Sequence, residues 1–159
     1  MFWVIAILTM FVGVIIALTQ TDVKRMLAYS SIAHAGFLLI AVIATNEQGI
    51  GGAMFYLLAY GVATIGAFGV VSLVRDSTGE ATHLSSWAGL GKRSPWVAGA
   101  FTIFLLSFAG IPLTAGFIGK FAVFGAGVAG GAGWLVVVAV IASAIAVFFY
   151  GRVIVIMFF

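Results

Sequence analysis

Five long segments without a charged residue divide this 159-residue chain, and their lengths limit what it can fold into. They cover residues 2–20, 26–46, 48–74, 94–119 and 121–151. A helix needs about 20 apolar residues to cross the hydrocarbon core of a membrane. A strand of a membrane barrel would instead alternate apolar and polar residues over about ten positions. The uninterrupted apolar runs therefore predict helices that span a membrane.

We predict an all-α fold, a polytopic bundle of transmembrane helices within a single domain. The expected spans are 2–19, 26–45, 50–74, 95–124 and 134–158. Composition supports this class, because 7% of the residues are charged, whereas about 25% are charged in soluble domains. So few charges cannot cover a water-facing surface, which excludes a soluble enzyme. Between the spans, we expect a small interfacial helix at 83–90 and a turn rich in glycine and alanine at 125–133.

Basic residues in the linkers indicate the orientation of the chain. The first and third linkers hold most of them: Lys24, Arg25, Arg75, Lys92 and Arg93. The second linker carries only Glu47, and the fourth carries no charge. Since Lys and Arg collect on the cytoplasmic side, the N-terminus is predicted outside and the end near Arg152 inside. These scattered basic residues form no run of the kind that binds nucleic acid.

Two further features concern what the chain lacks. It contains no cysteine, which excludes iron–sulfur clusters held by thiolates of this chain, and no grouping of ligands predicts a metal site.

Its last residues, 153–159, are purely apolar with no polar cap. We therefore expect a fragment of a longer protein, with at least one further segment missing.

Lys120 is the first polar residue expected at membrane depth. It lies about 7 residues before the glycine-rich turn, or roughly 10 Å inside the predicted outer end. A charge in the hydrocarbon slab is costly, so it usually faces a bundle interior or water and marks an ion or proton path. Burial disfavours a lysine's ammonium form, which suits a reversible proton carrier. The alternative is a long side chain that reaches the outer interface.

His34 is expected near the middle of the second span, with Ser30 and Ser31 one turn before it on the same helix face. Histidine exchanges protons near neutral pH and suits a proton relay. A neutral histidine that hydrogen-bonds between helices is about as good an explanation.

The segment 109–116 predicts a break within the fourth span. Pro112 removes a backbone donor and crowds the carbonyl of Phe108, and Gly110 and Gly116 loosen the flanks. Broken helices at the membrane midplane mark ion sites in transporters, because freed carbonyls must face protein or water. A plain proline kink is the alternative.

Tyr60 and Thr64 lie one turn apart in the third span. They are candidates for lining a polar path, although such residues more often hydrogen-bond between helices.

Three segments resemble the antiporter-like membrane subunits of respiratory complex I, the NADH:quinone oxidoreductase. They are 20–37 (QTDVKRMLAYSSIAHAGF), 60–71 (YGVATIGAFGVV) and 107–121 (SFAGIPLTAGFIGKF). The last is similar to a broken helix of these subunits. By this likeness the five spans correspond to helices nine to thirteen of a fourteen-helix fold. They make up most of the second of its two inverted repeats.

The resemblance implies a subunit that translocates protons across the bacterial cytoplasmic membrane as electrons pass from NADH to a quinone. Lys120 matches the family's lysine on the outer side of the proton path, and His34 matches a relay position at the midplane. Lys24 matches a lysine at the cytoplasmic edge, where a solvated interface charge is the simpler explanation. Ser30, Tyr60 and Thr64 are assigned supporting roles.

The same resemblance implies partners and cofactors. The partners would be the lipid bilayer and the other membrane-arm subunits. No cofactor is expected on this chain, since NADH, FMN, the iron–sulfur clusters and the quinone belong to the other subunits.

Two other functions remain open. The first is a subunit of the related multisubunit cation/proton antiporters; against it, the third span lacks the histidines and lysine expected there. The second is a fragment with only a structural role.

Overall fold

The computed structural model describes residues 1–77 and 79–159. Its main elements are the helices α1 (Phe2–Thr19), α2 (Val23–Ala44), α3 (Glu47–Leu73), α5 (Pro95–Ala109), α6 (Ala115–Ala129) and α7 (Gly133–Phe158). Between α3 and α5 lie two short antiparallel strands, β1 (Arg75–Asp76) and β2 (Gly79–Glu80), the 3₁₀ turn η1 (Leu84–Trp87) and the short helix α4 (Leu90–Arg93).

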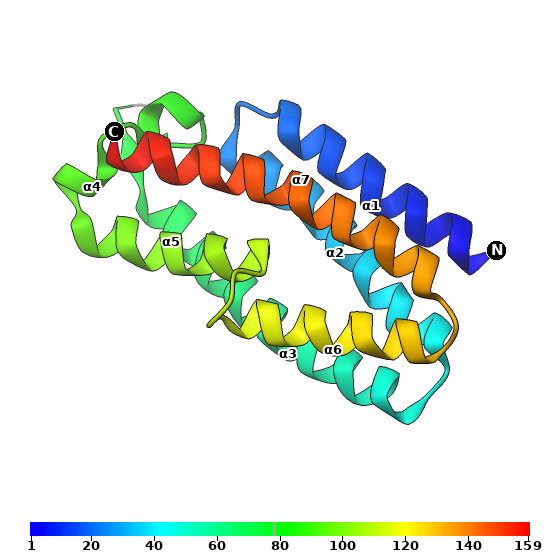
Figure 1. The fold of residues 1–159 in the computed structure, drawn as a ribbon. Coiled ribbons are helices and arrows are strands. Elements are labelled where there is room, and N and C mark those ends of the chain that lie inside the picture. The colour runs from blue at the N-terminus through cyan, green and yellow to red at the C-terminus, as the bar shows by residue number, and fades with distance from the viewer. Residues whose placement is uncertain (78) are drawn as a thin grey trace.

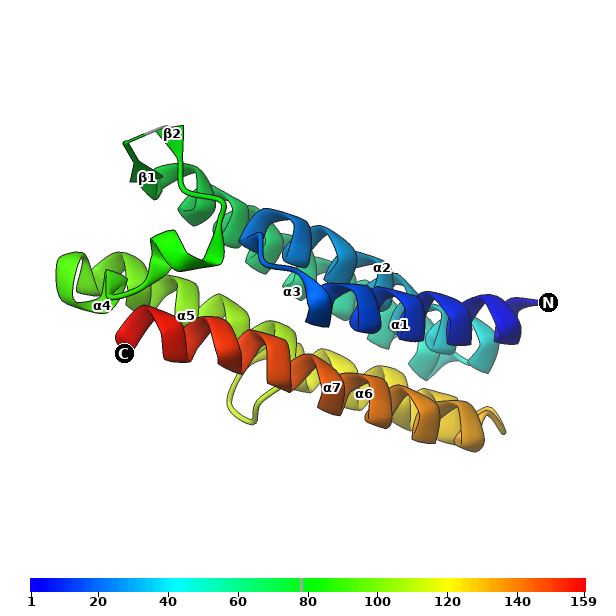
Figure 2. The same ribbon diagram turned by 90° about the horizontal axis from the view of Figure 1, so that it is seen from above.

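The long helices run roughly along one common direction, and α5 and α6 follow each other end to end (Figure 1 and Figure 2). One end of this bundle carries the N-terminus, the α2–α3 turn and the α6–α7 turn. The other end carries the α1–α2 linker, the segment from β1 to α4 and the C-terminus. All five linker residues that are basic therefore lie at one end of the bundle, as the charge pattern predicts.

The predicted all-α membrane fold is confirmed. Within the described residues, α1, α2, α3 and α7 are each long and apolar enough to cross a membrane. The fourth predicted span is divided into the shorter apolar helices α5 and α6. The start of each of two helices is capped by a side chain, since Asp22 accepts from the Arg25 N–H at 2.8 Å and Asn46 from the Gly49 N–H at 2.7 Å.

One boundary was wrong. The fourth span was expected to end at 124 and to be followed by a turn, but α6 continues to Ala129. Gly127 serves close packing rather than a turn, since a Cβ there would lie 2.6 Å from a methyl of Ile40 in α2. Lys120 consequently lies nine residues before the end of α6, roughly 14 Å, which is deeper than predicted.

Helix α2 lies at the centre of the packing. It contacts α1, α3, α6 and α7, and half of its most apolar window is buried, more than in any other of the four spanning helices. Outward-facing positions of the other helices expose large apolar side chains such as Leu58, Ile65 and Phe148. This arrangement suits lipid as the surrounding solvent and leaves α2 as the best-protected place for polar groups.

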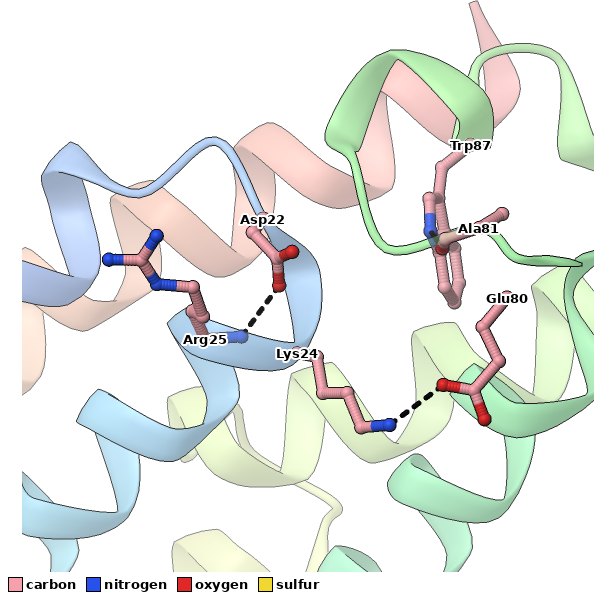
Figure 3. A network of polar contacts seen from close by, with 6 residues as sticks. All are labelled: Asp22, Lys24, Arg25, Glu80, Ala81 and Trp87. Carbon is pink, nitrogen blue, oxygen red and sulfur yellow. Dashed lines mark hydrogen bonds and ion pairs between the residues drawn. The ribbon is translucent and has the colours of Figure 1, made fainter. Parts of the chain in front are cut away.

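The segment between α3 and α5 is fastened to the start of α2. Backbone N–H groups of Val23 and Leu84 donate to Thr82 and Thr21 carbonyls, both at 2.8 Å. The buried Trp87 indole donates to the Ala81 carbonyl at 2.6 Å (Figure 3). In place of the single interfacial helix predicted at 83–90, the structure has the 3₁₀ turn η1, and the separate helix α4 begins only at Leu90, after Gly89 with φ 69°.

Candidate functional site

The break between α5 and α6 is set by local sequence. Gly110 ends α5 in the left-handed region with φ 76°, and its N–H donates to the Leu106 carbonyl at 3.0 Å. Pro112 has no N–H to offer the Phe108 carbonyl, which a continuous helix would require. Thr114 then caps α6 by accepting from the Phe117 N–H at 3.2 Å. The result leaves the last carbonyls of α5 without partners from its own backbone.

Lys120 hydrogen-bonds with two of these carbonyls. Its side chain is 5% exposed, and its Nζ donates to the Phe108 carbonyl at 2.8 Å and the Ala109 carbonyl at 3.2 Å. The third donor goes to the Ser143 hydroxyl on α7 at 2.9 Å. All three ammonium donors are thus satisfied, and the negative end of the α5 dipole favours a positive charge at this position.

Close packing explains why positions 110 and 116 of the break are glycine. A Cβ on Gly110 would lie 2.9 Å from the Lys120 Cδ, so glycine leaves room for the lysine as well as permitting the turn. Gly116 donates its N–H to the Ser107 hydroxyl at 3.1 Å, and a Cβ there would collide with the Ser107 backbone. The two half-helices therefore meet too closely for side chains at either glycine.

A cavity of about 330 Å³ lies beside Lys120, between the break and α7. Its wall is largely apolar, with Phe117, Phe121 and Val140 among the lining residues, and Lys120 and Ser143 supply its polar atoms. This volume is large enough for several waters, since each takes roughly 30 Å³ in the liquid. The lysine amine thus borders a pocket that is large enough to hold water.

His34 lies in a second polar cluster formed by α2, α3 and α7. The imidazole is 2% exposed; its Nδ1 hydrogen-bonds with the Tyr56 hydroxyl and its Nε2 with the Tyr150 hydroxyl at 3.3 Å. It also stacks on the Tyr60 ring, with centroids 4.3 Å apart. Both ring nitrogens therefore have hydroxyl partners, so the imidazole can accept a proton on one side and donate on the other.

The supporting residues have different positions. Tyr60 donates to the Ser31 hydroxyl at 2.8 Å and so joins α3 to α2. Buried Ser30 donates to the Leu27 carbonyl at 2.8 Å, and Thr64 donates to the Tyr60 carbonyl at 2.7 Å. The Thr64 hydroxyl is therefore used within its own helix.

Lys120 and His34 are brought close together but not into contact. The Lys120 Nζ lies 5.0 Å from the centre of the Phe37 ring, and the His34 ring packs edge-on against the same phenyl at 5.6 Å. Phe108, whose carbonyl accepts from Lys120, lies 5.8 Å from the His34 ring. Phe37 thus contacts both titratable groups, and Phe108 contacts His34 through its ring and Lys120 through its carbonyl.

Lys24 is placed elsewhere, at the end of the bundle that carries the linker charges. Its Nζ forms an ion pair with Glu80 at 2.7 Å, and both side chains are substantially exposed (Figure 3). The Lys24 ammonium holds the pKa of the Glu80 carboxylate below its ordinary value. The structure therefore gives Lys24 a surface contact between α2 and β2.

Three residues of these clusters were missed from sequence: Tyr56, Ser143 and Tyr150. A signal for them existed. Tyr56 precedes Tyr60 by one helical turn, and Ser143 and Tyr150 are the uncharged polar residues of the fifth span, seven positions apart and hence on one face. A search for every hydroxyl at membrane depth would have found all three.

The comparisons with known proteins agree on one family. A family model described as NADH:quinone oxidoreductase/Mrp antiporter, transmembrane, matches residues 1–146. The chain belongs to this family. The resemblance predicted from the three sequence segments is thereby confirmed.

Among curated relatives of this antiporter family, NADH-quinone oxidoreductase subunit N 3 of Streptomyces griseus is 68% identical over 157 residues. That alignment covers 99% of this chain and 28% of the relative. Subunit N of Rhodococcus opacus is 67% identical over 157 residues, with 99% and 29% covered. The chain thus spans less than a third of the length of the curated relatives it matches.

Solved structures give the same family fold. A chain of respiratory complex I from Thermus thermophilus matches with a TM-score of 0.88 at 36% identity, with 99% of this chain and 35% of that chain covered. A chain of the Mrp complex from Dietzia matches with the same TM-score at 27% identity, with 99% and 29% covered.

Proposed function

We propose that this chain forms part of subunit N of a proton-translocating NADH:quinone oxidoreductase. The observation that carries the proposal is the buried Lys120 ammonium, held by two carbonyls freed at a helix break and by Ser143. The high identity to the subunit N relatives of Streptomyces griseus and Rhodococcus opacus supports it. The chain's contribution is to bind and pass on protons, while the redox steps belong to other subunits.

The proposed proton path has two proton-binding groups, the His34 cluster and Lys120. The His34 cluster passes a proton between the Tyr56 and Tyr150 hydroxyls, and Lys120 passes one to the cavity beside it. A positive charge that reaches the His34 cluster would repel the Lys120 ammonium across Phe37 and Phe108. In a medium of low dielectric such repulsion is strong, and it favours release of the lysine proton into the cavity. Supporting roles in the path are proposed for four further residues: Lys24, Ser30, Tyr60 and Thr64.

The proposed orientation follows from the charges. The end of the bundle with Lys24, Arg25 and Arg93 lies on the cytoplasmic side of a bacterial inner membrane, by the positive-inside rule. The N-terminus of the chain then lies outside, and the end near Arg152 inside. The proposed partners are the other membrane-arm subunits of the complex. NADH, FMN, iron–sulfur clusters and a quinone are assigned to those subunits, since the chain has no cysteine to hold a cluster.

A gentle fractionation tests this proposal. Membranes that contain the full-length protein are solubilised in mild detergent, separated on a native gel and stained for NADH dehydrogenase activity. We expect the chain and the activity in one large band. A chain that migrates apart from the activity, in membranes that exchange sodium for protons, would overturn the proposal in favour of a cation/proton antiporter. The shared fold with the Mrp complex makes that the relevant competitor.

A further inference from the structure

A second cavity lies at the end of the bundle that carries the linker charges, away from Lys120. It has a volume of about 290 Å³ and lies between the end of α3 and the start of α5. Two arginines and a serine line it, Arg75, Arg93 and Ser94, together with the apolar residues Leu73, Val74, Leu90 and Val97. The proton path described above uses none of these residues.

The charges at this cavity are unbalanced. Among the described residues, no carboxylate lines it. Glu80 faces Arg75 across the β1–β2 pair, but its carboxylate is already bound to Lys24 at 2.7 Å. Arg93 donates to the Ser86 and Ala88 carbonyls through one nitrogen, at 3.0 and 3.4 Å, and its guanidinium has five N–H donors in all. Two arginines therefore line a cavity that no carboxylate of the described residues lines.

The surroundings place the cavity at a membrane interface. α3 and α5 both belong to the membrane-crossing part of the fold, and the cavity lies where one ends and the other begins. Trp96, in the first turn of α5, is 90% exposed, as expected of an aromatic anchor at the headgroup level. Leu73, another lining residue, is 71% exposed and apolar. A ligand here meets positive charge on one side and hydrocarbon on the other.

We propose that this cavity binds the headgroup of an anionic phospholipid from the cytoplasmic leaflet. Its phosphodiester would lie against Arg75 and Arg93, which suit bidentate recognition of phosphate, and its acyl chains would lie along Leu73 and Val97. The volume accommodates a phosphate and part of a glycerol, since one water takes about 30 Å³ in the liquid. This proposal does not depend on proton translocation.

Native mass spectrometry of the full-length protein tests it. The delipidated protein is titrated in separate arms with phosphatidylglycerol, phosphatidylcholine and inorganic phosphate. The variant is Arg75→Gln with Arg93→Gln, and the matched control is Lys92→Gln, which removes an adjacent charge that does not line the cavity. We expect phosphatidylglycerol to bind the wild type and to weaken roughly fivefold per arginine lost. The control should weaken clearly less, because Lys92 does not line the cavity.

A third variant separates charge from folding. Arg75→Lys with Arg93→Lys keeps both charges but loses the bidentate geometry, so phosphatidylglycerol should bind more weakly than to the wild type and more tightly than to the double glutamine variant. Binding as weak as that of the glutamine variant would point to a purely structural role. Equal weakening by Lys92→Gln, equal binding of phosphatidylcholine, or occupancy by inorganic phosphate alone would each overturn the lipid site.

Discussion

Replacing Gly110 by alanine gives a test of the helix break that can be worked out from the structure. The residue has φ 76°, and an alanine there costs roughly 1–2 kcal/mol of backbone strain. The new Cβ would also lie 2.9 Å from the Lys120 Cδ and 3.3 Å from its Nζ. Because the lysine side chain is flexible, it will shift and lose at least one charge-assisted hydrogen bond, worth roughly 1.5–3 kcal/mol. Alanine's smaller entropy in the unfolded chain offsets about 0.4–1 kcal/mol, which leaves roughly 2–4 kcal/mol of destabilisation.

The chain supplies two matched controls for this substitution. Gly131 has nearly the same backbone angle, φ 77°, but a Cβ there would contact nothing within 4 Å. Gly131→Ala should therefore show the strain alone, about 1 kcal/mol. Gly99 lies inside α5 with open space around it, so Gly99→Ala should be stabilising by roughly 0.5–1 kcal/mol.

Denaturant titration of the full-length protein in detergent measures the three variants, and proton pumping per electron in reconstituted vesicles measures their function. We expect the order of stability Gly99→Ala, Gly131→Ala, Gly110→Ala, with pumping reduced only in the last. Equal destabilisation at Gly110 and Gly131, with equal pumping, would refute the claim that glycine at 110 makes room for Lys120.

Three further outcomes are expected. Tyr56→Phe removes the hydroxyl bound to His34 Nδ1 while keeping the buried ring, so pumping should fall while electron transfer and assembly, followed on a native gel, change little. Gly116→Ala would force a Cβ against the Ser107 backbone, and the variant should assemble poorly, as measured by the yield of intact complex. For Glu80, the lowered pKa means that its ion pair with Lys24 is intact at neutral pH and is lost as the pH falls through that lowered value. An NMR titration of the labelled carboxylate should show a midpoint that moves back toward normal in Lys24→Ala, since Lys24 is the main cause of the shift.

Much of this fold follows from the sequence because a membrane allows few alternatives. The charge-free runs give the helices, and Pro112 with its flanking glycines gives the break, since the missing N–H is a purely local cause. The end of α6 was less predictable. Gly125, Gly127 and Ala129 have turn-like composition, and only the packing of Gly127 against Ile40 of α2 and Val136 of α7 shows why a small residue lies within a helix there.

The candidate site likewise has residues that the sequence predicts and partners that only the structure shows. Lys120 and His34 stand out in any apolar sequence, because polar groups at membrane depth are costly. Their partners do not, since Tyr150 follows His34 by 116 residues and Ser143 follows Lys120 by 23. These side chains become neighbours only when α7 packs against α2 and α6. A carbonyl partner such as that of Phe108 has no sequence signal beyond the proline four residues later.

The most direct test of the central claim is the ratio of protons pumped to electrons transferred in a complex whose full-length subunit carries Lys120→Met. Methionine fills similar space but cannot hold a proton or donate to the Phe108 and Ala109 carbonyls. The account predicts an assembled complex that oxidises NADH with a clearly reduced proton ratio. An unchanged ratio in the assembled complex would contradict it.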